Sequence, residues 1–362
     1  MNRTNGHKPA AWRAPEVRRT PPQVAVIGGG SGASVLLRGL KRHTGAVSAI
    51  VTMFDSGGSS GILRREFDLP ALGDIRQCLV ALSDEDNGSD SLRSAVQFRF
   101  GKGSGLKGHS MGNLMLAALT MDGDVEAAVA EMSQMLDVKG EVIPVTLEKA
   151  DLCAELEDGS IVHTESAIDL RGVSDPGVRR VFLDTPAQAN PRAVRAIMRA
   201  DAVVLGPGDL YTSIIPNLLA TGVSEALQKT EARVVYVCNL MTRRGETDGF
   251  HASDFVAEVS RYMGGRKPDW VVVNTKPVST EAQSLYALEG AHPVEVDWRN
   301  LYHFARNVYG GALAEEDGKL RHDSGRLADI IVKLARAENG AYRSPDVTSS
   351  NPVSGAPQGA RA

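Results

Sequence analysis

Short runs of apolar, mostly β-branched residues recur along the chain, and each run gives way to glycines or polar residues. Such runs are typical of buried strands in a parallel sheet, because helices cover both faces of that kind of sheet. They predict strands at residues 24–27, 49–53, 202–205, 234–237 and 270–273. Apolar residues at helical spacing predict helices at residues 34–43, 75–82, 114–119, 189–199, 215–226 and 326–335. This alternation predicts an α/β fold, a Rossmann-like, doubly wound, mostly parallel sheet.

The pattern changes between about residues 142 and 183, where short segments alternate apolar and polar residues. Two such segments, 146–156 and 161–168, are separated by the turn sequence Glu157-Asp158-Gly159. Alternation interrupted by a tight turn is typical of a hairpin. We therefore expect a small antiparallel insert in the α/β domain.

The two ends of the chain differ in composition from the rest. Residues 1–22 hold five Lys and Arg, one acidic residue and four prolines, and residues 337–362 are rich in Ser, Pro, Gly and Ala. Both are predicted to be disordered tails of one nucleotide-binding domain at residues 23–336. The N-terminal tail lacks the apolar stretch of a secretion signal, and no window resembles a membrane span, which favours a cytoplasmic protein.

Charge and cysteine content exclude some classes of function. The formal net charge is −4, and leaving out the tails, with net charges of +4 and 0, brings the rest of the chain to −8. Domains that bind nucleic acid usually present a basic face, so we expect no nucleic-acid partner. Cys78, Cys153 and Cys238 lie far apart in apolar surroundings, which indicates reduced core residues and neither a disulfide framework nor a zinc site.

A glycine-rich turn follows the first predicted strand and opens the first predicted helix. Its glycines match the G-x-G-x-x-G/A pattern up to Ala33, in which backbone N–H groups at a helix N-terminus face a phosphate. No Gly-Lys-Ser/Thr follows, so kinase or ATPase chemistry is not expected. The residues predicted to bind a diphosphate are Gly28, Gly29, Gly30, Ser31 and Gly32.

The second predicted strand is followed by an aspartate and then by glycines and serines. An acid at this position of a dinucleotide fold accepts hydrogen bonds from ribose hydroxyls. The small residues after it predict a second anion-binding turn, with a plain surface turn as the alternative. The residues expected to contact a ligand here are Asp55, Gly57, Gly58 and Ser59.

Two predicted helices begin with polar residues. Asp74 is placed to cap one helix or to hold a metal, and Arg76 to pair with a phosphate. Residues 108–112 match the nucleophile pattern G-x-S-x-G, but a polar segment precedes them where a hydrolase has a strand, so a serine hydrolase is not favoured. The ligand donors expected at this second helix start are His109, Ser110 and Asn113.

Two more polar loops follow later strands. The loop after residue 205 predicts contacts from Gly206, Gly208, Tyr211, Thr212 and Ser213, with Asp209 beside them. Asn239 and Thr242 follow the next strand and suit a base or a sugar, since an amide both donates and accepts hydrogen bonds. Because the carboxyl ends of parallel strands meet at one edge of a sheet, we expect all these clusters to form one ligand site.

Together the clusters resemble the YvcK-like gluconeogenesis factors, which form one superfamily with the 2-phospho-L-lactate transferases (CofD). The resemblance spans about residues 24–335 and rests on six ordered motifs, at residues 28–32, 55–61, 73–76, 108–113, 206–217 and 239–242. It implies a Rossmann-like, often dimeric protein that binds UDP-sugars such as UDP-N-acetylglucosamine and requires no cofactor. It also implies a regulator that links carbon metabolism in gluconeogenic growth to cell-wall synthesis and cell shape, with cell-wall synthesis proteins as partners.

One residue before the last predicted helix gains a role from this resemblance. Arg321 lies in a segment similar to a basic segment of the YvcK-like proteins, which implies that it reaches the diphosphate across a cleft. An exposed charge beside a helix cap is the alternative. Ser324 is a candidate phosphorylation site whose charge would compete with the ligand for Arg321.

The transferase branch is the alternative function that the resemblance implies. Its members move a phospholactyl or phosphoenolpyruvyl group from a guanosine diphosphate donor to a deazaflavin with magnesium. Here Asp55, Asp74 and Asp209 would supply the magnesium ligands, and His109 would orient a phosphoryl oxygen. Many members carry two consecutive aspartates where this chain has Asp55 and Ser56, which weakens the case for metal-dependent transfer. A nicotinamide oxidoreductase is a third alternative, supported by the first glycine motif alone.

Overall fold

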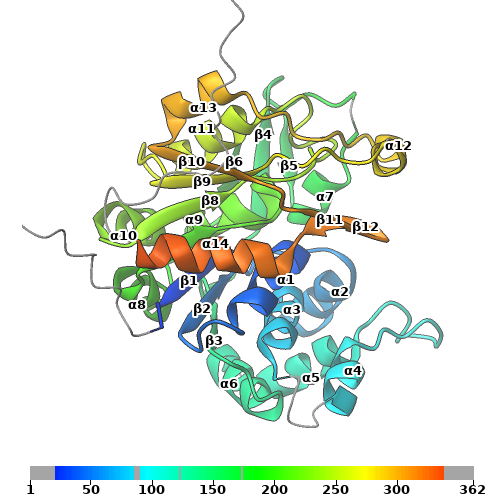
Figure 1. Ribbon diagram of the computed structural model, residues 1–362. Coiled ribbons are helices and arrows are strands. Elements are labelled where there is room, and N and C mark those ends of the chain that lie inside the picture. Colours follow the sequence, from blue (N-terminus) through cyan, green and yellow to red (C-terminus); the bar gives the residue numbers. More distant parts are fainter. Residues whose placement is uncertain (1–20, 85–89, 122–123, 173, 338–362) are drawn as a thin grey trace, which may run out of the picture.

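A seven-stranded sheet forms the centre of the molecule, and all its neighbouring strands are parallel (Figure 1). The computed structural model describes residues 21–84, 90–121, 124–172 and 174–337. The strands of this sheet are β1 Val24–Gly28, β2 Val47–Val51, β3 Glu141–Pro144, β7 Ala202–Leu205, β8 Arg233–Val237, β9 Trp270–Asn274 and β10 Asn307–Gly311. Their order is β10-β9-β8-β7-β1-β2-β3, so the chain winds outward from β1 in one direction and from β7 in the other. The predicted Rossmann-like, doubly wound α/β fold is confirmed.

All five predicted strands form, with ends shifted by at most two residues. The sequence pattern does not predict β3 and β10, the two edge strands. β3 begins with a glutamate and ends with a proline, and β10 ends in two glycines, so neither is a run of β-branched residues. Residues 142–144 pair with β2 in the main sheet, and the expectation that they begin the insert is wrong.

The antiparallel insert is a separate three-stranded sheet in the order β5-β4-β6. It consists of β4 Leu152–Leu156, β5 Ile161–His163 and β6 Val178–Leu183, and it confirms the predicted small antiparallel sheet. The predicted limits of its segments are partly wrong, since strand structure begins only at Leu152. After β5 the chain turns at Thr164, which has a φ of 75°, into the short helix α7 Glu165–Asp169.

Helices form at five of the six predicted positions, as α1 Gly30–Leu40, α3 Gly73–Leu82, α5 Met111–Thr120, α8 Pro191–Arg199 and α14 Ser324–Arg336. The single helix predicted at residues 215–226 is wrong. The chain there forms the π-helical turn η1 Leu210–Ile214, then α9 Ile215–Leu219 and α10 Val223–Lys229. The break falls at Gly222, whose φ of 106° lies outside the right-handed helical region.

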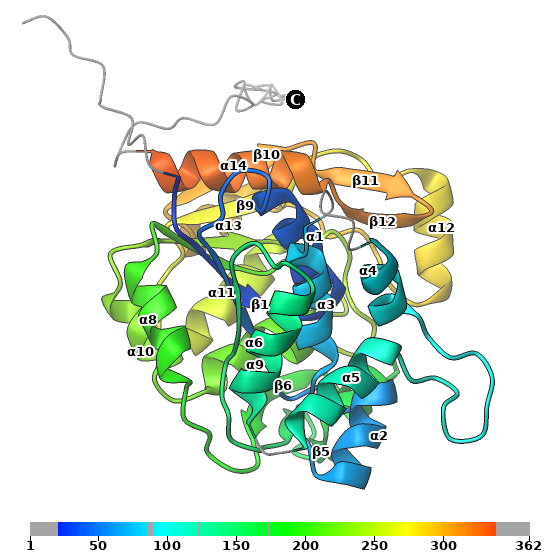
Figure 2. The same cartoon turned by 90° about the horizontal axis from the view of Figure 1, so that it is seen from below.

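Other helices that the pattern does not predict surround the sheet, namely α2 Gly58–Phe67, α4 Asp90–Gln97, α6 Val125–Met135, α11 Ala252–Tyr262, α12 Thr280–Leu288 and α13 Trp298–Phe304. A hairpin of β11 Ala314–Asp317 and β12 Lys319–His322 leads into α14. Figure 2 shows α12 and this hairpin at one end of the molecule, and α8 and α10 at the other. None of the described helices is long and apolar enough to cross a membrane.

The three cysteines are buried free thiols, as the sequence indicates. Most of the two predicted disordered tails lies outside the described residues, at 1–20 and 338–362. The tails and the limits of the domain therefore stay predictions.

Candidate functional site

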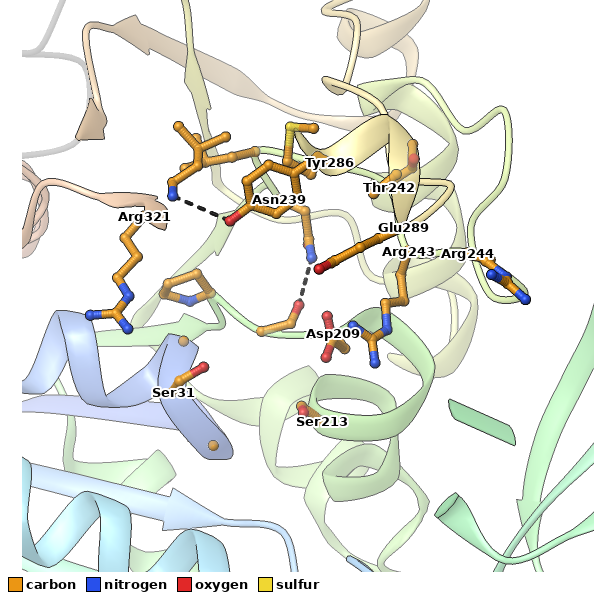
Figure 3. A pocket seen from close by; sticks show the side chains of 18 of the residues that line it. Ser31, Asp209, Ser213, Asn239, Thr242, Arg243, Arg244, Tyr286, Glu289 and Arg321 are labelled. Carbon is orange, nitrogen blue, oxygen red and sulfur yellow. Dashed lines mark hydrogen bonds between the residues drawn. The ribbon is translucent and has the colours of Figure 1, made fainter. Parts of the chain in front are cut away.

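The loops after β1 and β7 meet at the carboxyl edge of the sheet, where the strand order reverses. Ligands of doubly wound folds bind in the crevice at such a point. The contact is close, since a Cβ atom on Gly32 would lie 2.4 Å from the carbonyl oxygen of Pro207. Beside the two loops is a cavity of about 720 Å³, which is within the usual range for small-molecule sites (Figure 3).

Many of the predicted ligand residues line this cavity. They come from segments far apart in sequence: the start of α1, the β7 loop with η1, the β8 loop and β12. The structure therefore brings these loops together as expected, whereas their contacts with a ligand stay a prediction. These lining residues are Gly29, Gly30, Ser31, Gly32, Gly208, Asp209, Ser213, Asn239, Thr242 and Arg321.

Other predicted residues support the cavity from beneath and are not part of its lining. The carbonyl oxygen of Gly28 accepts a hydrogen bond from the Asn217 side chain at 3.3 Å. In η1, Tyr211 is buried, and the Thr212 hydroxyl donates to Glu246 at 3.3 Å. These residues shape the loops, and the direct ligand contacts predicted for them and for Gly206 stay a prediction.

Asn239, at the end of β8, holds the neighbouring loop. Its Nδ2 donates to the carbonyl oxygen of Gly208 at 2.8 Å, and its Oδ1 accepts from the Tyr236 hydroxyl at 3.3 Å. Figure 3 shows the side chain reaching toward the β7 loop. The geometry assigns this amide to positioning Gly208, and the predicted recognition of a base or sugar by Asn239 stays a prediction.

Arg243 and the predicted residue Asp209 form the wall opposite Ser31 (Figure 3), and Asp169 also lines the cavity. Neither Arg243 nor Asp169 is selected by the sequence analysis. Arg243 forms an ion pair with Asp169. Burial lowers the pKa of Arg243, but the charges of Asp209 and Asp169 outweigh this effect, so the pKa is raised overall. Burial raises the pKa of Asp209, against the opposite effect of Arg243. This wall therefore presents a cation whose charge is partly balanced by two carboxyl groups.

Two arginines of the cavity lack a partner. Arg244 and Arg321 make no hydrogen bond or ion pair within the described part of the chain. In Figure 3 they lie at opposite sides of the cavity. A guanidinium group can donate two parallel hydrogen bonds to two oxygens of one phosphate or carboxylate group. Both ends of the cavity are therefore suited to anionic groups.

The roof of the cavity is formed by α12 and the β11–β12 hairpin. The Tyr286 hydroxyl at α12 accepts a hydrogen bond from the backbone N–H of Leu320 at 3.2 Å, which joins the two (Figure 3). No residue of α12 is buried, and Leu288, which lines the cavity, is 83% exposed. The roof is thus much less embedded in the protein than the floor.

The remaining predicted residues form a second polar cluster, which we call the inner cluster and which is separate from the cavity lining. The Ser59 hydroxyl lies 2.9 Å from His109 Nδ1, and Arg76 Nε donates to Asn113 Oδ1 at 2.8 Å. Ser110 caps α5 by accepting from the backbone N–H of Asn113. The inner cluster contains Asp55, Gly57, Gly58, Ser59, Asp74, Arg76, His109, Ser110 and Asn113.

Asp74 connects the inner cluster with the β1 loop. A Cβ atom on Gly29 would lie 2.3 Å from Asp74 Oδ2, and the Gly30 backbone hydrogen-bonds to the carboxylate. Burial, and then the charge of Asp55, raises the pKa of Asp74 to about 7. A carboxyl group with this pKa is about half protonated near pH 7, which reduces the repulsion that an anion on the β1 loop would meet.

Helix α7 of the insert bridges the inner cluster and the cavity. Ser56, which follows Asp55, donates from its hydroxyl to Ser166 Oγ at 3.0 Å, and its backbone N–H donates to Glu165 at 3.2 Å. Burial, and then the charge of Asp55, raises the pKa of Glu165 to about 8. At the other end of α7, Asp169 binds Arg243 in the cavity wall.

The carboxylates of the alternative magnesium site are not gathered into one cluster. Among the residues that the structure describes, no three His, Cys, Asp or Glu side chains gather closely enough to hold a metal ion. Asp55, Asp74 and Asp209 thus do not form a closed ligand set. Magnesium here would be held by one or two of these carboxylates together with phosphate oxygens, an arrangement that this ion often adopts.

Ser324 lies where α14 packs against α1. Its hydroxyl donates to the carbonyl oxygen of Val35 at 2.7 Å. A phosphate on this oxygen would remove that hydrogen bond, close to the helix that begins at the β1 loop. Phosphorylation at this serine stays a prediction.

His322, a buried lining residue at the end of β12, leads to a prediction on stability. Burial lowers its pKa from 6.5 to about 4, against a hydrogen bond to the Cys238 backbone, and its Nε2 has no partner. Between these pH values the unfolded chain binds a proton that the folded chain excludes, so the free energy of unfolding falls as the pH decreases. We expect this residue to account for a loss of roughly 3 kcal/mol from pH 7 to pH 4.

Urea unfolding at several pH values measures this effect. His322→Asn is expected to reduce the loss on acidification, whereas His303→Asn, which replaces an exposed histidine, is the matched control and should leave it unchanged. An equal loss in wild type and His322→Asn would contradict the prediction.

Comparison with known proteins decides the family. The family profile described as "2-phospho-L-lactate transferase CofD" matches residues 24–313, most of the chain. The chain belongs to the CofD family. Within it, the chain is similar to the curated "Gluconeogenesis factor" of Halalkalibacterium halodurans, with 43% identity over 314 residues, covering 86% of this chain and 95% of the relative. It is also 42% identical to the "Gluconeogenesis factor" of Bacillus subtilis over 319 residues, covering 87% and 98% of the two chains.

The fold of this CofD-family chain is also similar to that of a solved structure. The crystal structure of a Bacillus halodurans protein of the UPF0052 family has a TM-score of 0.81 and 42% identity to it, covering 86% of this chain and 99% of that chain. The resemblance to the YvcK-like gluconeogenesis factors is therefore confirmed, together with the fold.

Several cavity residues of the CofD-family chain are not selected by the sequence analysis. For Arg243 and Arg244 a signal exists, because they directly follow Thr242 in a loop already expected to bind ligand. Arg171 follows α7, and its guanidinium donates to Gly245 at 2.7 Å, a contact that no local motif indicates. Tyr286 and Glu289 belong to the α12 segment, which the pattern does not predict.

Proposed function

We propose that the chain is a cytoplasmic regulator that binds a UDP-sugar, such as UDP-N-acetylglucosamine, and links carbon metabolism to cell-wall synthesis and cell shape. The observation that carries the proposal is the meeting of two glycine-rich loops beside a cavity of about 720 Å³. Helix α1 begins there, and the backbone N–H groups of a helix N-terminus attract a diphosphate. The relatives' name, gluconeogenesis factor, supports the metabolic part.

The polar groups of the cavity suggest how such a ligand is held. We expect the diphosphate on the loop at residues 29–32, with the guanidinium of Arg321 approaching from the hairpin. The rest of the ligand would extend along the β8 loop, where Thr242 and Arg243 stand next to the apolar Leu240 and Met241. This mixture of an anion site and a half-apolar wall suits a nucleotide joined to a sugar.

A transferase of the phospholactate type is the second candidate. The family description favours it, and so do the carboxyl groups of Asp55 and Asp74 behind the β1 loop. Against it stands Ser56, whose hydroxyl bonds to Ser166 where many family members carry a second aspartate. In this reaction magnesium would neutralise phosphate charge between donor and acceptor.

Isothermal titration with UDP-N-acetylglucosamine, GDP and NAD, each with and without magnesium, distinguishes these functions. We expect one UDP-N-acetylglucosamine per chain, bound without magnesium and at least tenfold more tightly than the other two. Magnesium-dependent release of a guanine nucleotide in the presence of a deazaflavin acceptor would favour the transferase. Preference for NAD over both other ligands would favour the oxidoreductase.

Arg321→Ala adds a test of the site itself. Loss of a charge-assisted hydrogen bond is expected to weaken UDP-N-acetylglucosamine binding by about tenfold. Arg299→Ala is the control, because Arg299 is an exposed arginine of α13 away from the cavity lining. Equal affinity in Arg321→Ala and wild type would contradict the proposed position of the diphosphate.

The cellular role and the partners have separate tests. Cells that lack the protein are expected to lose normal shape on a gluconeogenic carbon source, and the wild-type gene but not Arg321→Ala should restore it. Analytical ultracentrifugation tests the proposed homodimer. Cross-linking in cells tests the proposed association with cell-wall synthesis proteins.

A further inference from the structure

A second cavity, of about 480 Å³, lies at the opposite edge of the sheet, where β1, β2 and β3 begin. Its floor includes Val24, Val47 and Glu141 near the starts of these strands, and its wall is one face of α8. Figures 1 and 2 both place α8 at the end of the molecule away from α12, a helix that lines the first cavity. The function proposed above makes no use of this site.

Three arginines of α8 line the second cavity. Arg192, Arg195 and Arg199 are spaced by three and four residues, so they share one face of the helix and form a row about 10 Å long. Arg192 is neutralised by ion pairs with Glu126 at 3.4 Å and with Glu141 at 3.0 Å. Arg195 and Arg199 are exposed and make no hydrogen bond or ion pair within the described part of the chain.

Two unpaired cations four residues apart on a helix repel each other and slightly destabilise it. Arginines elsewhere in the described part of the chain often meet a carboxylate, as Arg64 does with Asp151 at 2.9 Å. Arg321, at the first cavity, is unpaired in the same way as Arg195 and Arg199. Unpaired guanidinium groups inside a concave surface are the arrangement that binds an anion.

The acidic groups near the row do not balance these two charges. Glu141, an acid in the lining, already binds Arg192 and also accepts a hydrogen bond from the Ser48 hydroxyl at 2.7 Å. Asp201, beyond the C-terminal end of α8, accepts from the backbone N–H of Gln23 at 2.9 Å. An anion in the cavity would therefore meet two cations that no neighbouring acid neutralises.

We propose that the second cavity binds a small molecule with several negative charges, an oligophosphate or a polycarboxylate, held between Arg195 and Arg199. The site is concave, which is typical of small-molecule sites, so a small molecule is a better occupant than the flat surface of a partner protein. Both ligand types offer the paired oxygens that a guanidinium fork binds. This site is separate from the UDP-sugar site and does not depend on it.

Isothermal titration of the full chain with inorganic triphosphate and with citrate tests the proposal. The ionic strength is kept low, at about 0.05 M, because salt screens exposed charges. We expect saturable binding of at least one probe to wild type, and binding at least tenfold weaker in the double variant Arg195→Ala/Arg199→Ala. Arg299→Ala, the exposed arginine of α13, is the matched control and should bind as wild type does.

The first cavity also offers an anion site, so a second variant separates the two. Arg321→Ala is expected to keep the binding event that the α8 double variant loses. Stronger binding of triphosphate identifies phosphate groups as the ligand chemistry, and stronger binding of citrate identifies carboxylates. Both outcomes support the site.

Three results would overturn the proposal: no saturable binding of either probe to wild type, equal binding by wild type and the α8 double variant, or an equal loss in Arg299→Ala. The two α8 side chains are exposed, and circular dichroism with urea unfolding checks that the double variant folds. Arg195→Gln/Arg199→Gln, which keeps side-chain length without charge, must give the same result. If UDP-N-acetylglucosamine does not bind, the function proposed above is wrong, but the test of the second cavity keeps its meaning.

Discussion

Gly32→Ala is expected to abolish binding of UDP-N-acetylglucosamine and to lower the free energy of unfolding by roughly 2 to 3 kcal/mol. The added Cβ would lie 2.4 Å from the carbonyl oxygen and 2.8 Å from the carbonyl carbon of Pro207, and 2.9 Å from the Cα of Gly208. All three are backbone atoms, which cannot rotate away as the end of a side chain can. The start of α1 and the β7 loop must therefore separate, and both line the cavity.

Titration with UDP-N-acetylglucosamine and urea unfolding measure the two effects of Gly32→Ala. Gly101→Ala is the matched control, because a Cβ at that position has no atom within 4 Å. It should leave both the affinity and the unfolding midpoint unchanged. A folded Gly32→Ala protein with wild-type affinity would show that binding does not need the close contact of the two loops.

Glu246→Ala is expected to have the second large effect, a loss of roughly 3 kcal/mol in the free energy of unfolding together with weaker ligand binding. The Glu246 side chain is fully buried and accepts hydrogen bonds from the Tyr211 backbone N–H and the Thr212 hydroxyl, each at 3.3 Å. Removing it leaves both donors without a partner and opens a void behind η1. Ser213 and Asp209, at this turn, line the cavity and should lose their fixed positions.

Glu246→Gln separates hydrogen bonding from charge at this position. Burial, and then the charge of Asp209, raises the pKa of Glu246 well above its usual range, so this position disfavours the charged carboxylate. A glutamine of similar shape is therefore expected to lose less than about 1 kcal/mol, since it keeps an acceptor oxygen. If Glu246→Gln is as unstable as Glu246→Ala in urea, the native side chain acts as a charge and this interpretation is wrong.

The sequence predicts the centre of the fold better than its edges, for a physical reason. β1 and β7 are buried on both faces and consist of apolar residues, so their composition identifies them. Edge strands need fewer apolar residues because one side has no neighbouring strand, and β3 and β10 carry Glu141, Pro144 and Gly311. The helix predicted across residues 215–226 fails at Gly222, where a positive φ outweighs the apolar periodicity.

The sequence predicts which loops form the site better than it predicts the contacts of their side chains. Strand ends and glycines locate the loops after β1, β7 and β8 at one edge of the sheet, because parallel strands all point the same way. The direction of each side chain depends on packing that the motifs do not encode. Asp74 lies against Gly29, and Asn239 donates a hydrogen bond to Gly208, so both support glycine loops, a role that the motifs do not indicate.

We expect the difference in burial between the floor and the roof of the first cavity to determine how the proposed ligand enters and leaves. Below the ligand, β1 and β7 are buried throughout, whereas above it α12 has no buried residue. Segments with few buried contacts open locally at low free energy. We therefore expect local opening of α12 to cost less free energy than opening of the strands. For the proposed ligand, we therefore expect much of the conformational entropy lost on binding to be lost in this helix, and the dissociation rate to depend on the contacts between the ligand and α12.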